Sequence, residues 1–244
     1  MRVLLLLLST TIAFCAYNET AAKMMLNLAA GAYGNDSMRQ ACVLRTFASN
    51  EIQEIVSSFT VDCDTLANTC SGYIVASQPL QQVTVVFQGT KTDSQLLLEG
   101  WTTINPQEPF YNMGNANTYF VRGLERLWPS VEAVLNNTLY TNYHVYFTGH
   151  SLGAAMANLA AAKTVQLGLR QGSQVSLLNF GQPRVGNIEY SNNFDNIITD
   201  SYRVISEADI VPHIPACAKM DNTTNSAGSH PCDPGNTQKA YHTG

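Results

Sequence analysis

The stretch Gly149-His150-Ser151-Leu152-Gly153 separates two segments of different character. The apolar run Val145-Tyr146-Phe147 precedes it, and the small-residue run Ala154-Ala155-Met156-Ala157 follows it. This order predicts a β-strand, a sharp turn and an α-helix, with glycines on both sides of the serine because side chains there would collide with strand and helix. A serine on such a turn is held above the sheet edge, where a base and a substrate can reach its hydroxyl. The stretch therefore predicts a nucleophilic serine at position 151.

The rest of the chain alternates between strand-like and helix-like segments, without repeats or low-complexity linkers. Residues 21–30 carry an apolar face that ends at Gly31, and residues 120–135 repeat apolar side chains at helical spacing, which indicates core packing. Strands are expected at 73–75, 83–87, 145–147, 175–180 and 202–205. Helices between apolar strands predict an α/β fold, with a mostly parallel sheet covered by helices on both faces.

Composition restricts the class of protein. The chain has 244 residues, 45% of them hydrophobic and 13% charged, which suits one α/β domain with a sizeable core. The formal net charge is −5 and no Lys/Arg cluster follows the N-terminus, so we expect no nucleic-acid partner and favour a neutral or apolar substrate. No Cys/His cluster has ligand spacing, and we therefore expect neither a metal site nor a cofactor.

The N-terminus predicts export. Residues 1–16 combine an early arginine, a leucine run and a small-residue end, as in a secretory signal peptide cleaved near 15/16. The alternative is a buried first helix. No other segment approaches the length of a transmembrane anchor. Four potential N-glycosylation sites, at Asn18, Asn35, Asn136 and Asn222, agree with a secreted, extracellular glycoprotein.

If the signal peptide is removed, the number of remaining cysteines becomes informative. Removal of Cys15 leaves five cysteines, an odd number in an oxidising compartment where thiols tend to pair. Cys63 with Cys70, and Cys217 with Cys232, would each close a short loop, which leaves Cys42 without a partner. The alternatives are a free buried thiol or cleavage that retains Cys15.

Four stretches carry a resemblance to a known family. In chain order they are Phe87-Gln88-Gly89-Thr90, residues 149–153, Gly181-Gln182-Pro183-Arg184-Val185-Gly186 and Asp209-Ile210-Val211-Pro212-His213-Ile214-Pro215. Together they resemble the class 3 lipases, the fungal-type triacylglycerol lipase branch of the α/β-hydrolase superfamily. The resemblance extends from about residue 21 to the end, and it implies a single domain over 17–244. It also implies hydrolysis of lipid esters through an acyl-serine intermediate and without a cofactor. The lipid ester substrate can lie at a lipid–water interface.

The resemblance implies a role for each matching position. Ser151 would attack the ester carbonyl, and the resulting oxyanion would be stabilised by the backbone N–H of Leu152 and by the N–H and hydroxyl of Thr90. Asp209 would orient a histidine and stabilise its protonated form. The alternatives are that Thr90 is an ordinary turn residue and that Asp209 is an exposed acid at the start of a loop. Gln88 stands where relatives often carry arginine.

The catalytic base is the missing member of this set. Triads on this fold run serine, acid, histidine, so the base must follow Asp209, and only His213, His230 and His242 do. Relatives place the base in an aspartate-histidine pair followed by an aromatic pair, which does not occur here, and both His213 and His242 match non-catalytic positions. We therefore expect a chain incomplete at its C-terminus, with His242 only a fallback for the base and with little activity as written.

A further apolar stretch follows the expected oxyanion loop. Its large apolar side chains are Leu96, Leu97, Leu98 and Trp101. In the family this region is a lid that can open at a lipid surface. The alternative is a short helix packed permanently on the core.

Other functions remain open at this point. Pocket and lid set the acyl preference, so a full-length form could be a phospholipase A1 or an aromatic-acid esterase. From another class, the chain could be a secreted, catalytically inactive binding glycoprotein on a lipase scaffold. The retention of Ser151, Thr90 and Asp209 favours the enzyme.

Overall fold

A six-stranded mixed sheet forms the centre of the molecule. The computed structural model describes residues 17–51, 53–63, 69–90, 106–221, 223–224, 228 and 230–243. In spatial order the strands are β1 (Glu54–Asp62), β2 (Thr69–Ser77), β3 (Gln82–Phe87), β6 (His144–Gly149), β7 (Val175–Phe180) and β9 (Asp200–Val204). The pairs β1–β2 and β2–β3 are antiparallel, whereas β3–β6, β6–β7 and β7–β9 are parallel. The predicted mostly parallel sheet is confirmed, and its antiparallel part consists of the pairs β1–β2 and β2–β3.

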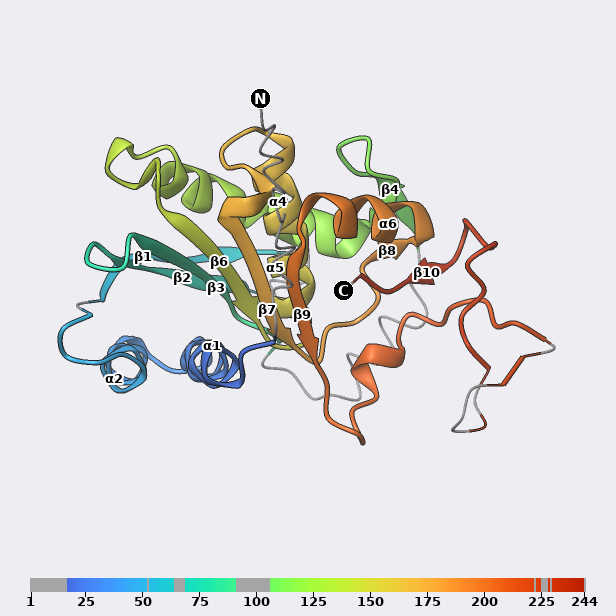
Figure 1. The fold of residues 1–244 in the computed structure, drawn as a ribbon, viewed down its shortest axis with the longest axis horizontal. Coiled ribbons are helices and arrows are strands. Elements are labelled where there is room, and N and C mark those ends of the chain that lie inside the picture. The colour runs from blue at the N-terminus through green and yellow to red at the C-terminus, as the bar shows by residue number, and fades with distance from the viewer. Residues whose placement is uncertain are drawn as a thin grey trace, which may run out of the picture.

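Helices cover both faces of this sheet (Figure 1). On one face lie α1 (Glu19–Gly31) and α2 (Asp36–Thr46), and on the other lie α4 (Thr118–Leu135) and α5 (Leu152–Gln166). Short 3-10 turns are η1 (Thr138–Tyr140), η2 (Gly172–Gln174) and η3 (Val211–His213). A second sheet beside α6 (Ile188–Ile197) contains β4 (Gln107–Pro109), β5 (Asn115–Asn117), β8 (Gly186–Asn187) and β10 (Ala240–Tyr241). The architecture is that of a single α/β domain.

Strand side chains alternate between two hydrophobic cores. Val85 packs in the core beneath α4 and α5, whereas its neighbour Val86 packs in the core beneath α1. The same alternation separates Leu177 from Leu178 on β7. Because successive side chains on a strand point to opposite faces, near-continuous apolar strands are required where both faces are buried. This explains why the central strands carry almost no charge.

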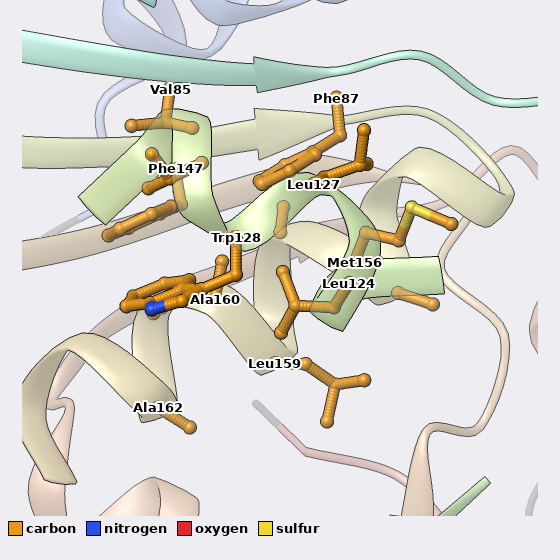
Figure 2. Packing of buried hydrophobic residues seen from close by; sticks show 14 of the residues in the cluster. Val85, Phe87, Leu124, Leu127, Trp128, Phe147, Met156, Leu159, Ala160 and Ala162 are labelled. Carbon is orange, nitrogen blue, oxygen red and sulfur yellow. The ribbon is translucent and has the colours of Figure 1, made fainter. Parts of the chain in front are cut away.

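The larger core joins α4 and α5 to the sheet. Figure 2 shows Leu124, Leu127 and Trp128 of α4 packed toward Phe147 and toward Met156 of α5. Helix α5 is buried along nearly its whole length and is rich in alanine, so it can lie close to both α4 and the strands. The predicted core-packing role of 120–135 is confirmed. Tight packing here fixes the N-terminus of α5, which follows Ser151 directly.

The cysteine pairing expected from the sequence is confirmed. Disulfides join Cys63 to Cys70 and Cys217 to Cys232, and Cys42 is free. The expected signal peptide at 1–16 lies outside the described residues. Within the part of the chain that the structure describes, no helix has the length and apolar character needed to cross a membrane.

Candidate active site

Four parallel strands end together at one edge of the sheet. The last residue of β3, Phe87, lies opposite Gly149 at the end of β6, and Phe180 of β7 lies opposite Val204 of β9. The segments that follow these ends carry the site residues expected from the sequence: Thr90 after β3, Ser151 after β6 and Asp209 after β9. The carboxyl edge of an open parallel sheet is where α/β proteins bind ligands. The fold thus brings the three predicted positions to one edge.

Ser151 lies on the sharp turn between β6 and α5. Its backbone has φ 58° and ψ −122°, a region that side-chain-bearing residues rarely adopt. A Cβ on Gly149 would overlap the backbone of Gly153, and a Cβ on Gly153 would overlap the carbonyl oxygen of Phe87. The N–H of Ser151 donates to the carbonyl of Phe180 at 3.0 Å, which ties the turn to β7. The glycine spacing therefore has the steric cause that the sequence suggested.

Two donors expected from the sequence lie near this turn. Leu152 is the first residue of α5, so its backbone N–H has no acceptor within the helix. The Oγ1 of Thr90 is buried and has no hydrogen-bond partner among the described residues. An unpaired buried hydroxyl costs free energy, and such exceptions call for an explanation. An unused donor at this edge is suited to an oxygen atom that is present only during a reaction.

Asp209 presents its carboxylate to the same edge. Its Oδ1 accepts the backbone N–H of Val211 at 2.9 Å, which fixes the side chain against its own loop. A Cβ at position 181 would lie 2.6 Å from Oδ2, so only glycine leaves room for the carboxylate there. Gly181 has φ +57°, and its N–H donates to the carbonyl of Val204 at 2.9 Å. The acid is thus anchored through one oxygen, while the other faces the turn after β7.

His150 and Tyr33 join the site, although sequence reasoning missed them. The hydroxyl of Tyr33 lies 3.0 Å from Nδ1 of His150 and also receives a backbone hydrogen bond from Gly89. Burial raises the pKa of Tyr33 to about 12 and lowers the pKa of His150, and the charge of Asp209 partly opposes the second shift. Tyr33 therefore connects the turn carrying Ser151 with the loop carrying Thr90. The position of His150 inside the serine turn was the only sequence signal for this contact.

The histidines that follow Asp209 lie in different surroundings. His213 and His230 are exposed, and Nδ1 of His230 lies 2.9 Å from the carbonyl of Thr223. His242 is half-buried beside Arg203 and Arg184, and burial together with these two charges lowers its pKa to about 2. A general base must accept a proton near neutral pH. This environment disfavours that step at His242.

The structure describes Gln88 but not the predicted lid residues. Gln88 is buried, and its Oε1 accepts the hydroxyl of Ser71, while its Nε2 has no partner among the described residues. The predicted lid residues Leu96, Leu97, Leu98 and Trp101 lie outside the described residues. Within the described ranges, no group of three or more His, Cys, Asp or Glu side chains could hold a metal ion.

Comparison with known proteins places this arrangement in a family. The family model "Lipase (class 3)" matches residues 84–219. The lipase ZK262.3 of Caenorhabditis elegans is 51% identical over 229 residues, covering 93% of this chain and 64% of the relative. The phospholipase A1-II 1 of Oryza sativa subsp. indica is 30% identical over 128 residues, covering 52% of this chain and 30% of the relative.

Solved structures agree on the fold. The crystal structure of the lipase from Rhizopus microsporus var. chinensis superposes with a TM-score of 0.67 at 22% identity, covering 85% of this chain and 75% of that one. The sheet, the serine turn and this likeness define an α/β-hydrolase fold. With its family model spanning more than half of the sequence, the chain belongs to the class 3 lipase family. It spans just under two thirds of the length of its nematode relative.

Proposed function

We propose that the protein is a serine carboxylic-ester hydrolase of the triacylglycerol lipase type. The observation that carries the proposal is the strained turn at Ser151, held at the sheet edge to which Thr90 and Asp209 also belong. A residue is kept in such a backbone conformation only where the surrounding structure enforces it. The nematode lipase and the family model support the same class of reaction.

The proposed chemistry assigns one role to each residue. The Oγ of Ser151 attacks the ester carbonyl carbon while a base removes its proton, and the carbonyl oxygen becomes an oxyanion. The N–H of Leu152, with the N–H and Oγ1 of Thr90, donates to that oxyanion. Collapse of the tetrahedral intermediate expels the alcohol, which takes up the proton, and water then releases the acid from the acyl-serine. Asp209 orients the base and stabilises its protonated form.

We assign the role of catalytic base to none of the described histidines that follow Asp209. His213 and His230 are exposed, and His242 lies beside two guanidinium groups. Free imidazole can replace a missing histidine, because it supplies the same proton acceptor from solution. We therefore propose to measure hydrolysis of a medium-chain p-nitrophenyl ester with and without imidazole, on this chain and on Ser151→Ala.

The result that supports the proposal is a rate component that disappears in Ser151→Ala and grows with imidazole concentration. A Ser151-dependent rate without imidazole would also support it, and would mean that these residues contain a base. Equal rates in the two proteins under both conditions, with both shown to be folded by circular dichroism, would refute the hydrolase. That outcome would favour the inactive lipid-binding glycoprotein instead.

The substrate class is proposed from the relatives. We propose acylglycerols, because the nematode relative is a lipase. Phospholipase A1 activity is the second candidate, supported by the rice relative. Ser151-dependent release of fatty acid from emulsified tributyrin but not from phosphatidylcholine vesicles would support the first, and the reverse preference would support the second. Opening of a lid at residues 96–101 is proposed to contribute at such surfaces.

We also propose that the protein is exported and glycosylated. Two disulfides suit an oxidising compartment, and residues 1–16 would be removed on the way. Asn18, Asn35 and Asn136 are exposed at helix ends, and the Oδ1 atoms of the first two cap α1 and α2 while leaving their nitrogens available. A loss of mass on enzymatic removal of N-linked glycans from secreted protein is the expected result. An unchanged mass, or retention inside the cell, would contradict it.

A further inference from the structure

The segment directly after Asp209 has every backbone carbonyl from 212 to 215 paired. The N–H of Arg184 donates to the carbonyl of Ile214 at 2.8 Å. The Nη1 of Arg184 donates to the carbonyls of His213 and Pro215, the latter at 2.8 Å. The ring of His242 hydrogen-bonds to the backbone of Pro212, necessarily to its carbonyl because proline has no N–H. The side chains of Arg184 and His242 thus hold residues 212, 213 and 215, and the backbone N–H of Arg184 holds Ile214.

Arg184 is committed to this task. Its side chain is buried, with only 4% of the residue exposed, and among the described residues no carboxylate forms an ion pair with it. Burial and the neighbouring charge of Arg203 lower its pKa. Burying a cation is costly unless its hydrogen-bond donors are used, and here Nη1 donates to two backbone carbonyls, whereas the buried Nε has no partner among the described residues. An arginine in this position is explained by the segment it binds.

His242 complements Arg184 as a neutral donor. Its Nδ1 is buried and has no partner in the described structure, which leaves Nε2 as the atom that donates to Pro212. Arg184, Arg203 and His213 all disfavour a second proton on this ring. A neutral imidazole has one N–H and one acceptor. The ring is therefore neutral, and its single N–H donates to the carbonyl of Pro212.

The position of His242 is itself fixed by buried hydrogen bonds. The hydroxyl of Ser191 donates to the carbonyl of His242. The next residue, Thr243, is 2% exposed, and its Oγ1 accepts from Asn158 at 2.8 Å and from Gln182 at 3.1 Å. Asn158 belongs to α5, so the anchoring reaches the helix that follows Ser151. Residues 240–243 are thereby attached to the same framework as the serine turn.

The clamped segment controls the carboxylate of Asp209. Val211, which directly precedes the clamped residues 212–215, donates its N–H to Oδ1 of Asp209, and its carbonyl accepts the N–H of Ile214 at 3.1 Å. Arg184 belongs to the stretch 181–186, whose first residue, Gly181, borders Oδ2 of the same carboxylate. The stretch 181–186 therefore borders the carboxylate of Asp209 through Gly181 and holds the segment that follows Asp209 through Arg184.

We propose that Arg184 and His242 are positioning residues that fix segment 211–215 and, through Val211, the carboxylate of Asp209. The inference rests on the proposed role of Asp209 as the triad acid. It replaces the fallback role of His242 as the base with that of a neutral hydrogen-bond donor. The two roles for His242 predict opposite results for an amide substitution.

The first test needs no turnover. We expect the NMR signal of the His242 ring to show no titration between pH 4 and pH 8, and amide exchange at Val211, His213 and Ile214 to be slow. His242→Leu should accelerate that exchange by about tenfold or more, because the carbonyl of Pro212 loses its donor and the segment opens more often. His242→Gln, which retains an N–H donor, should restore slow exchange. Exchange unchanged in His242→Leu, or titration of His242 near pH 6.5, would overturn the proposal.

The second test separates positioning from catalysis. In the imidazole assay, His242→Leu and Arg184→Gln should lower the Ser151-dependent kcat by roughly tenfold, the cost of a misplaced acid, with little change in KM. His242→Gln should recover most of that loss, and His230→Gln, whose side chain is exposed and lies outside segment 211–215, should serve as the matched control with no effect. A His242→Gln variant as inactive as His242→Leu would contradict the proposal and restore the base. Normal exchange behaviour without any Ser151-dependent hydrolysis would leave the clamp standing and refute the hydrolase.

Discussion

A histidine, a serine and an aspartate lie at each end of the parallel strands, but the two ends differ in hydrogen bonding and in backbone strain. At the amino ends, Nε2 of His144 lies 2.7 Å from the hydroxyl of Ser176, which in turn donates to the carboxylate of Asp200. At the carboxyl ends, no described residue bonds the hydroxyl of Thr90, and Ser151 has an unfavourable backbone conformation. Ser176 is in regular strand and only 2% exposed. Unused donors and backbone strain, rather than the residue types, distinguish a candidate active site from a structural network.

The largest effect is expected from exchanging the two serines for alanine. Ser151→Ala should remove the enzyme-dependent hydrolysis of a p-nitrophenyl ester in the imidazole assay, because loss of a nucleophile costs on the order of a millionfold in turnover. Ser176→Ala should keep the rate within about threefold of the parent, since its hydroxyl serves only the network with His144 and Asp200. A similar loss in both variants would break the contrast between the two sheet edges.

A second pair of variants compares two buried, unpaired hydroxyls. The Oγ1 atoms of Thr90 and Thr148 both lack partners among the described residues. Thr90→Val should lower the Ser151-dependent rate by about a hundredfold to a thousandfold, as loss of an oxyanion donor does, without loss of stability. Thr148→Val should leave both rate and melting temperature nearly unchanged. If Thr148→Val were as damaging to the rate as Thr90→Val, Thr90 would have no special role.

Backbone strain should be measurable as stability. Ser151→Gly should raise the free energy of unfolding by about 1 kcal/mol, because glycine adopts φ 58° without the cost borne by a side-chain-bearing residue. Ser176→Gly should lower it, because glycine weakens a strand interior and the network with Asp200 is lost. Urea titrations followed by circular dichroism measure both. A destabilised Ser151→Gly protein would mean that the turn is unstrained.

The smallest effect concerns pH. Burial lowers the pKa of His144, partly opposed by the charge of Asp200, so the folded state binds a proton at this ring less readily than the unfolded chain does. Stability should therefore decline as the pH falls below about 6.5, where the unfolded histidine begins to bind protons. The groups facing the ring are Ser176, Asp200 and Tyr146. His144→Gln should show a shallower decline in melting temperature between pH 7.5 and pH 5 than the parent, and an identical slope would contradict this reading.

The sequence was most informative where local geometry dictates residue type. The glycines around Ser151 follow from collisions with α5 inside the turn and with Phe87 of the neighbouring strand β3, and the strand–turn–helix pattern predicts both. The helix at 120–135 and the central strands follow from apolar periodicity, and the two disulfides follow from short loop closure.

The features that the sequence did not reveal depend on tertiary contacts. Helix α2 has only two buried residues and strand β1 only one, so neither shows a strong apolar pattern. Tyr33 reaches His150 across 117 positions, and the network of His144 joins three strands. No local pattern encodes contacts between residues so far apart in the chain. The role of Arg184 likewise became visible only when the segment 211–215 lay against it.

Covalent labelling can show whether Ser151 at the carboxyl edge of the sheet is the reactive serine. The folded chain would be incubated with an alkyl fluorophosphonate in the presence of imidazole, digested, and mapped by mass spectrometry. We expect one adduct, on the peptide containing Ser151, that forms at least about a hundredfold faster than in urea-unfolded protein, because oxyanion donors act only when held in place. No adduct should appear on the peptide containing Ser176. Labelling of both serines at similar rates, or labelling of Ser151 no faster in folded than in unfolded protein, would contradict the assignment of the carboxyl edge as the active site.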